Sequence, residues 1–206
     1  MLDAHRFFLF LLAAVILAVT PGPGIFYVLA RTLAGGRREG ILSSLGTFAG
    51  GLIHVLAAAL GISAILAASA VAFHTVKFAG AAYLVWLGIR MIRTRNAALP
   101  VEASAPSRGA FGQGILTEAL NPKTALFFLS FIPQFIAPQL GHIFLQFLVL
   151  GAVSVALNTT ADLLVVTLAV PLGGRLKASA ALRRQRMASG IGMIGLGAYV
   201  ALVDTK

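Results

Sequence analysis

The sequence contains no cysteine, which excludes disulfide bonds and thiolate metal sites. Charged residues are scarce as well: they make up 11% of the 206 residues, against about 25% in an ordinary soluble domain. Hydrophobic residues make up 59%, and the mean hydropathy is +0.94. Because so few charges cannot cover a water-facing surface, we expect an all-α integral membrane protein, with one domain over residues 1–206 and the lipid bilayer as its solvent.

The residue sets that enzymes use are missing too. The four histidines are scattered, and no nucleophile is accompanied by a base. We therefore predict no enzymatic activity, no cofactor and no resident metal. The net charge of +10 does not indicate nucleic-acid binding, because the charges lie at the edges of apolar runs.

Six apolar stretches approach or exceed the ~20 residues that a transmembrane helix needs. They lie at about residues 7–30, 42–67, 72–92, 111–136, 143–171 and 188–204. The first is not interpreted as a cleaved signal peptide, because its apolar character resumes after Gly24.

Basic residues predict the orientation. Three connections, in the 30s, at 90–110 and at 173–187, hold 12 of the 16 Lys and Arg residues. The positive-inside rule makes these connections cytoplasmic and both termini periplasmic. The Pro/Ala/Ser-rich stretch 94–110 is expected to link two three-helix halves, about 1–93 and 111–206. The basic residues of 173–187 have a second interpretation, as a site for anionic lipid head groups.

Two halves of three helices each have opposite orientations. Pro21 lies 14 residues after Phe7, and Pro122 lies 11 residues after Phe111. The first helix of each half is therefore expected to be broken by proline. Paired breaks in inverted repeats indicate the binding site of a transporter.

The first break is the segment "TPGPG". Its two prolines lack N–H groups and disturb the helical hydrogen bonds. Irregular backbone at membrane depth must be buried in protein or line a cavity. We predict that this segment binds substrate, with a proline kink for packing as the alternative. The predicted residues are Thr20, Pro21, Gly22, Pro23 and Gly24.

The second break contains Asn121, Pro122 and Lys123, which are also predicted to bind substrate. Pro122 frees the carbonyl of Glu118, and Asn121 and Lys123 are donors beside it. The Lys123 ammonium either meets an anionic group of the substrate, or caps freed backbone or pairs with a carboxylate.

The helix at 143–171 carries Ser154, Asn158 and Asp162 on one face. Asn158 is predicted to bind substrate. At 1.5 Å per residue, Asp162 and Glu118 lie at about the same depth. Burial favours a protonated carboxyl, whereas a nearby ammonium favours the carboxylate. Both acids are therefore candidates for proton coupling, with a static ion pair as the alternative.

His54 is the third candidate for proton coupling. It shares a helix ridge with Gly46 and Gly50, whose small size allows another backbone to approach closely. The ridge is expected to pack within the bundle or to form a homodimer. His54 is either a proton relay or a packed residue bonded to a carbonyl.

Four segments resemble the LysE/RhtB family of amino-acid exporters: "TPGPG", "GTFAGGLIHVLAAALG", "YLVWLGIRMI" and "NPKTALFFLSFIPQF". The resemblance runs from about residue 7 to 136. It implies proton-driven efflux of amino acids or their derivatives across a bacterial inner membrane. Pro21 to Pro23 and Asn121 to Lys123 match the family's two breaks. The chain departs from the pattern at Gly24, where the family usually has Asn, and at Glu118, where a neutral polar residue is common.

Three alternatives remain: export of a different small solute, export of a divalent metal through the carboxylates and His54, and a passive channel. Amino-acid export predicts that overexpression relieves the toxicity of particular amino acids or analogues but not of metals.

Overall fold

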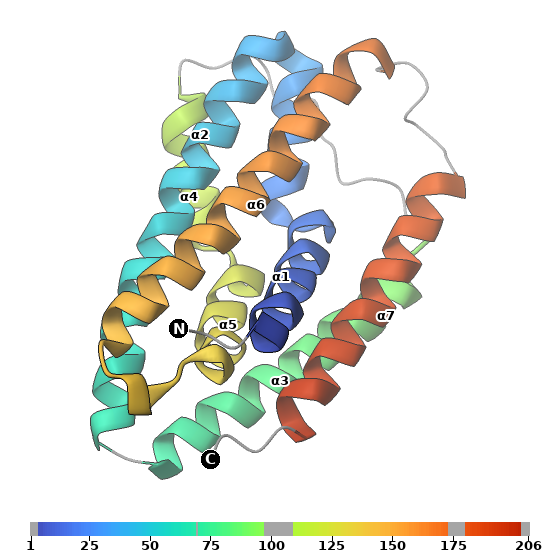
Figure 1. The fold of residues 1–206 in the computed structure, drawn as a ribbon. Helices are drawn as coiled ribbons and strands as arrows, with labels where there is room; N and C mark the ends of the chain where they lie inside the picture. Colours follow the sequence, from blue (N-terminus) through green and yellow to red (C-terminus); the bar gives the residue numbers. More distant parts are fainter. Residues whose placement is uncertain (1–3, 69, 97–108, 173–179, 203–206) are drawn as a thin grey trace.

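The structure, a computed structural model, describes residues 4–68, 70–96, 109–172 and 180–202. Over these ranges every regular element is a helix, as predicted (Figure 1). The helices are α1 (Ala4–Val19), α2 (Pro23–Ala68), α3 (Ala70–Arg93), α4 (Ala110–Ala119), α5 (Pro122–Ser130), α6 (Ile143–Leu172) and α7 (Ala180–Leu202), with short 3-10 helices η1 (Ile132–Phe135) and η2 (Pro138–Leu140).

Two stretches, Pro23–Gly61 and Ile143–Ala169, are apolar and long enough to cross a membrane. Helices suit that setting because each satisfies its own backbone hydrogen bonds. Most of the predicted linker 94–110 and the start of the basic connection 173–187 lie outside the described residues.

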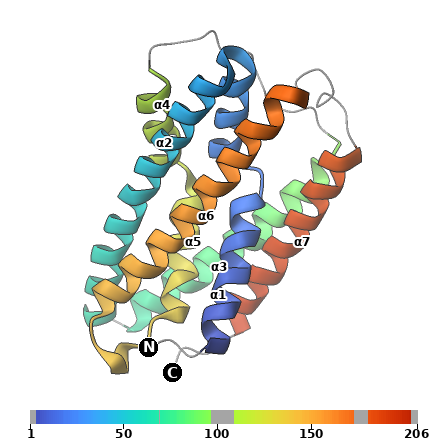
Figure 2. The same ribbon diagram turned by 45° about the horizontal axis from the view of Figure 1, so that its top comes forward.

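The chain reverses direction inside α2 at Gly36. This residue has φ 76° and ψ −170°, a left-handed conformation that favours glycine. The Arg31 guanidinium reaches Glu39 at 2.6 Å, although eight residues of continuous helix would span about 12 Å. The two arms of α2, 23–35 and 37–68, therefore fold back on each other (Figure 2).

The predicted spans differ from these helices mainly at their ends. The second arm of α2 begins directly after Gly36 instead of at residue 42, and α7 begins at Ala180 instead of at 188. Both extensions carry basic residues, which lower the hydropathy without preventing a helix.

The bundle has two ends, and the helices run from one end toward the other. The Gly36 turn, the end of α3, the start of α4, the end of α6 and the start of α7 lie at one end (Figure 2). The start of α1 and the end of α7 lie at the other. The three connections that were predicted to be cytoplasmic thus leave from the same end.

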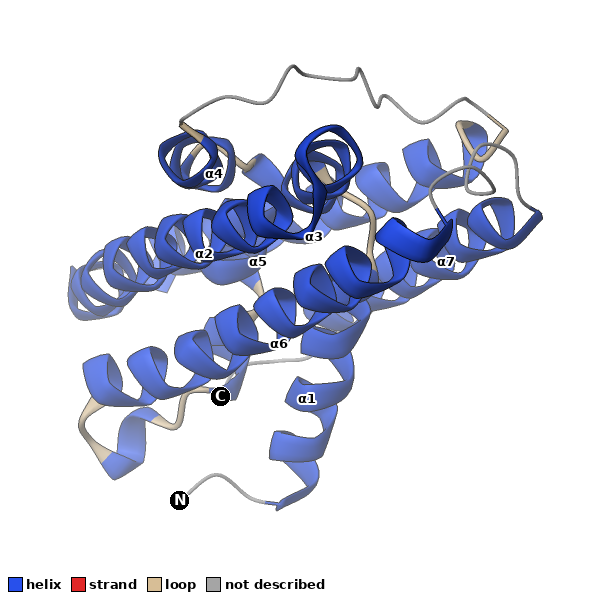
Figure 3. Ribbon diagram, turned by 90° about the horizontal axis from the view of Figure 1, so that it is seen from above, coloured by secondary structure: helices blue, strands red, loops and turns tan. Residues whose placement is uncertain are grey.

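Two groups of helices contact the broken ones. Helix α2 packs on α4 and α6, and α3 packs on α7. The short helices α1 and α5 each contact both groups; seen from above, α5 lies inside the bundle and α1 lies beside α6 and α7 (Figure 3).

Close contacts recur between the two halves in reciprocal pairs. A Cβ added to Gly51 would lie 3.1 Å from Val155, and one added to Gly151 would lie 2.7 Å from Val55. Gly88 and Gly190 likewise each face the carbonyl of the other. Positions about 100 residues apart therefore occupy equivalent places in these helix pairs.

An aromatic cluster fills the bundle between α5 and η1. Phe10, Phe127, Phe131 and Phe135 form this cluster, and each is at most 1% exposed. Consecutive rings of Phe127, Phe131 and Phe135 lie 5.0 and 4.9 Å apart between centroids. Phe10 of α1 meets Phe135 edge-on at 5.6 Å. Apolar rings thus join the two broken helices at the end away from the Gly36 turn.

Candidate functional site

The first break occupies residues 20–22, between the end of α1 and the start of α2. Pro23 is the first residue of α2, where its missing N–H costs nothing. Gly24 consequently lies in the first helical turn. Our interpretation of Gly24 as part of an unwound segment is therefore wrong.

The second break lies between α4, which ends at Ala119, and α5, which begins at Pro122. Asn121 caps α5: its backbone is extended, and its Oδ1 accepts a bond from the N–H of Lys123 at 3.1 Å. Asparagine before a first-turn proline is a strong helix start. The same arrangement of an interrupted helix restarted by proline thus occurs in both halves.

Lys123 connects the two breaks. Its ammonium donates to the carbonyls of Thr20 at 2.9 Å and Leu17 at 3.3 Å. Leu17 lies four residues before Pro21, so its carbonyl has lost its usual helical partner. A cation at the C-terminus of α1 also meets the negative end of the helix dipole. The capping of freed backbone is thus present in the structure, and the binding of an anionic substrate group by Lys123 stays a prediction.

Glu118, at the end of α4, contacts the first turns of both α5 and α2. Its carboxylate accepts bonds from Asn121 Nδ2 at 3.0 Å and from Thr124 Oγ1 at 2.6 Å. A Cβ added to Gly24 would lie only 2.5 Å from Glu118 Oε2. The carboxylate therefore faces the first turn of α2, where the helix dipole favours negative charge.

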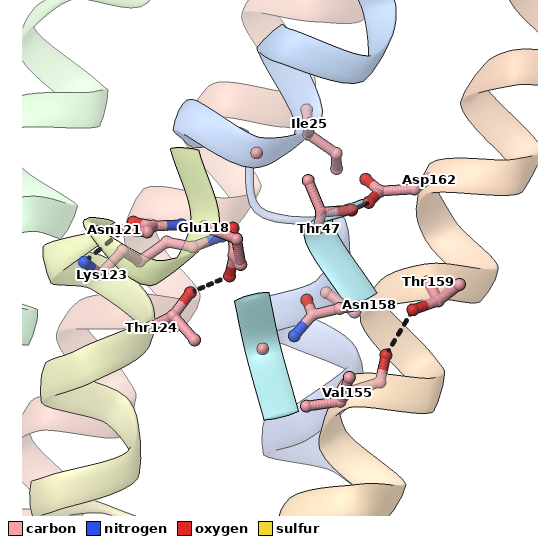
Figure 4. A pocket seen from close by; sticks show the side chains of 13 residues that line it. Ile25, Thr47, Glu118, Asn121, Lys123, Thr124, Val155, Asn158, Thr159 and Asp162 are labelled. Atoms are coloured by element: carbon pink, nitrogen blue, oxygen red, sulfur yellow. Dashed lines mark hydrogen bonds between the residues drawn. The ribbon is translucent and has the colours of Figure 1, made fainter. Parts of the chain in front are cut away.

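Asp162 of α6 lies on the opposite wall (Figure 4). One of its oxygens accepts a bond from Thr47 Oγ1 at 2.8 Å. Asn158, one turn away on the same helix, also lines the space between the walls. Glu118, Lys123 and Asp162 are each 7% exposed or less, so all three depend on the protein for their polar contacts.

These residues enclose a polar cavity at the breaks. It leaves about 20 Å³ for the centre of a water-sized sphere, which is about the room of one water molecule. An amino acid requires much more, so helices must move before a solute of that size can enter.

His54 lies behind Glu118 rather than in the cavity. Its Nε2 is 2.8 Å from the main-chain oxygen of Glu118, the carbonyl that Pro122 deprives of its helical partner. This geometry agrees with a packed histidine bonded to a carbonyl.

Six of the twelve predicted site residues line the cavity: Gly24, Glu118, Asn121, Lys123, Asn158 and Asp162. Thr20 and Gly22 instead contact Lys123, and Pro23 is exposed. Pro21, Pro122 and His54 are not part of the lining either. Thr47 and Thr124 hold the two carboxylates and were not predicted, because their only signal in the sequence is a hydroxyl within an apolar run.

The ridge of Gly46 and Gly50 packs within the bundle. A Cβ at Gly46 would collide with the carbonyl of Phe111, and one at Gly50 would lie 2.6 Å from that of Ile115. Helix α4 therefore covers this ridge, and a homodimer would require another surface.

An all-helical apolar chain with two broken helices around a buried polar cavity has the architecture of a membrane transporter. The chain belongs to the family of LysE type translocators, whose model matches residues 15–203. It is thus a transmembrane transporter of an efflux family and not an enzyme.

Several curated proteins are similar over most of the chain. An uncharacterized membrane protein of Vibrio cholerae is 33% identical over 205 residues, 97% of this chain and 98% of that protein. A homoserine/homoserine lactone efflux protein of Salmonella typhimurium is 31% identical over 94% of this chain and 95% of its own. A leucine efflux protein of Klebsiella pneumoniae is 32% identical over 62% and 61%, respectively. No solved structure matches the chain.

Proposed function

We propose that the protein exports amino acids or amino-acid derivatives from the bacterial cytoplasm through the central cavity. The observation that carries this proposal is the pair of contacts between the two helix breaks. Lys123 donates hydrogen bonds to the end of α1, and Glu118 faces the start of α2. The names of the relatives, homoserine/homoserine lactone and leucine efflux proteins, support amino-acid-like solutes.

The proposed topology has six transmembrane spans in two inverted halves, about 1–93 and 111–206, within one domain. The reciprocal pairs Gly51–Val155 and Gly151–Val55 support the repeat. The common end of the basic connections supports a cytoplasmic Gly36 turn, a cytoplasmic 94–110 linker and periplasmic termini in the inner membrane.

The solute is proposed to bind between the cavity walls. Its carboxylate would meet the remaining N–H of Lys123, and its ammonium would meet the carboxylates and Asn158. Asn121 and Gly24 would shape the wall around Glu118. Thr20, Pro21, Gly22, Pro23 and Pro122 would act by shaping the two helix ends rather than by touching the solute.

We assign the returning proton to Asp162. Both oxygens of Glu118 already accept bonds, as in an ionised carboxylate, whereas Thr47 bonds to one oxygen of Asp162. The second oxygen of Asp162 is free to take a proton. His54 is engaged by a carbonyl and is a weaker candidate.

Counterflow in proteoliposomes tests the proposal. Vesicles loaded with unlabelled homoserine or leucine should accumulate the labelled amino acid, while empty liposomes and Lys123→Ala vesicles should not. A lack of accumulation with a full panel of amino acids would contradict the proposal.

Divalent-metal export is the main alternative. Across the part of the chain that the structure describes, no group of three or more His, Asp and Glu side chains is arranged to hold a metal ion. Overexpression should therefore relieve growth inhibition by amino-acid analogues and leave metal toxicity unchanged.

A further inference from the structure

Resting on the proposed function, we infer that the protein recognises its solute through the ammonium group, which binds in a slot between Glu118 and Asp162. The slot is the part of the cavity bounded by these two side chains and Asn158 (Figure 4). The substrate class is then primary amines of amino-acid size, whether or not they carry a free carboxylate.

The slot presents acceptors from both walls. An ammonium has three donors and no acceptor. Glu118 offers an oxygen from α4, and Asp162 has an oxygen that Thr47 does not use. Asn158 adds an amide oxygen beside Asp162. A carboxylate in the same place would face two like charges, so the geometry selects a cation.

Lys123 offers fewer hydrogen bonds to a solute carboxylate than the slot offers to an ammonium. Two of its three N–H groups are directed to the carbonyls of Leu17 and Thr20. One donor remains, against at least three acceptors for the ammonium. Loss of the solute carboxylate should therefore cost less affinity than loss of its ammonium.

Gly24 fixes the position of the Glu118 wall. An added Cβ would lie 2.5 Å from Oε2, which is the far end of a flexible side chain, and 3.8 Å from the next residue, Thr47. A methyl group here should displace the carboxylate and leave the backbone in place. Gly24 is thus a positioning residue for ammonium binding, and its lack of a side chain is required for the slot.

Gly24 of α2 and Glu118 of α4 therefore lie against each other. The space that a side chain at position 24 would fill holds the Glu118 carboxylate. The two residues act together to place a negative charge in the cavity.

The slot also explains how a proton and a solute would exclude each other. The titratable groups around it in the described residues are Glu118 of α4, Asp162 of α6, Lys123 of α5 and, behind Glu118, His54 of α2. A proton on Asp162 removes its charge and one acceptor, and a bound ammonium needs both. Each ammonium that leaves the slot therefore makes room for one proton.

The test is competition in counterflow with the intact protein in proteoliposomes. The competitors are the methyl ester of the transported amino acid, which keeps the ammonium, and its N-acetyl derivative, which keeps the carboxylate. We expect the ester to compete within about threefold of the parent and the N-acetyl compound at least about tenfold more weakly, because the N-acetyl compound loses the charged hydrogen bonds to the slot.

Gly24→Ala should weaken competition by the parent and the ester about tenfold, since it disturbs the same charged hydrogen bonds. Gly61→Ala is the matched control, because nothing lies within 4 Å of its added Cβ. If Gly24→Ala does not reach the membrane, Glu118→Gln tests the slot in its place, because it removes the charge of the same carboxylate. Counterflow in which the N-acetyl compound competes as well as the parent, or in which these variants keep full affinity, would overturn the ammonium slot while leaving amino-acid transport intact. A wild-type protein without any counterflow would instead contradict the proposed function.

Discussion

The central cavity separates two regions of different chemistry. Toward the Gly36 turn the buried residues include four hydroxyl side chains, each at most 5% exposed: Thr32, Ser43, Ser44 and Thr47. Toward η1 lies the aromatic cluster of Phe10, Phe127, Phe131 and Phe135, each at most 1% exposed. The hydroxyl of Ser44 is buried, and the described residues give it no hydrogen-bond partner.

The two sides therefore differ in how they can open. Buried hydroxyls favour entry of water, since an unsatisfied polar group costs about 1–3 kcal/mol. Stacked aromatic rings contain no unsatisfied polar group that would attract water, so the rings must be moved apart before a solute can pass. The polar side is therefore the easier one to hydrate, and the aromatic cluster is the tighter barrier. In the proposed orientation the barrier lies on the periplasmic side, where release must occur.

We expect the largest effect on export from substitution of Lys123, which lies between the two regions. Lys123→Ala should abolish export, because the carbonyls of Leu17 and Thr20 lose their cation and the breaks lose their connection. Efflux from loaded cells measures this effect, and the amount of protein in the membrane is the control. Full export by this variant would show that the link is dispensable.

Substitution of the two carboxyls should separate their roles. Asp162→Asn should weaken solute binding too, since the bound ammonium needs this charge, but it alone should also make the remaining transport independent of the pH gradient, because it removes the proposed proton carrier. Glu118→Gln should lower solute affinity by about 10- to 100-fold, the equivalent of a charged hydrogen bond of about 1.5–3 kcal/mol. Counterflow and pH-driven uptake in the same vesicles distinguish the two. If Asp162→Asn keeps its pH dependence, the proton binds elsewhere.

The aromatic barrier can be weakened directly. Phe131→Leu keeps an apolar side chain but removes the ring that contacts both Phe127 and Phe135. We expect a leak, seen as faster entry of solute from the periplasmic side down its gradient. An unchanged entry rate, with normal amounts of folded protein, would argue against a barrier at this cluster.

The smallest effect is expected on the polar side. Ser44→Ala removes a buried hydroxyl to which the described residues give no partner, so the free energy of unfolding should stay the same or rise by about 1 kcal/mol, the lower end of the cost of an unsatisfied polar group. Export should stay within about threefold of wild type, because neighbouring hydroxyls still provide polar contacts. A leak as large as that expected for Phe131→Leu would remove the contrast between the two sides.

Much of the fold followed from residue types alone. Proline positions predict both helix breaks because a missing N–H acts locally, and apolar runs predict the helices. Glu118 and Asp162 lie on facing walls of one cavity, as two residues of similar depth can. Helix ends that extend beyond the apolar runs, such as the start of α7, were less accessible because hydropathy does not measure helix propensity.

Contacts between breaks could not be predicted, because they depend on how the halves pack. The reach of Lys123 to Leu17 crosses 106 residues of sequence. The role of Gly24 likewise depends on Glu118 lying against it, and a glycine beside prolines looks like part of a turn. Nothing in the sequence marked Thr47 and Thr124 as site residues except a hydroxyl within an apolar run.

The most direct test of a solute site at the breaks is cysteine protection. The chain has no native cysteine, so Thr159→Cys provides a single thiol in the cavity lining, at a hydroxyl that bonds only to its own helix at 2.9 Å. A saturating concentration of the transported amino acid should slow labelling of this cysteine in membranes and leave Gly61→Cys unaffected. Equal labelling of Thr159→Cys with and without the amino acid, in a variant that still transports it, would contradict the central site.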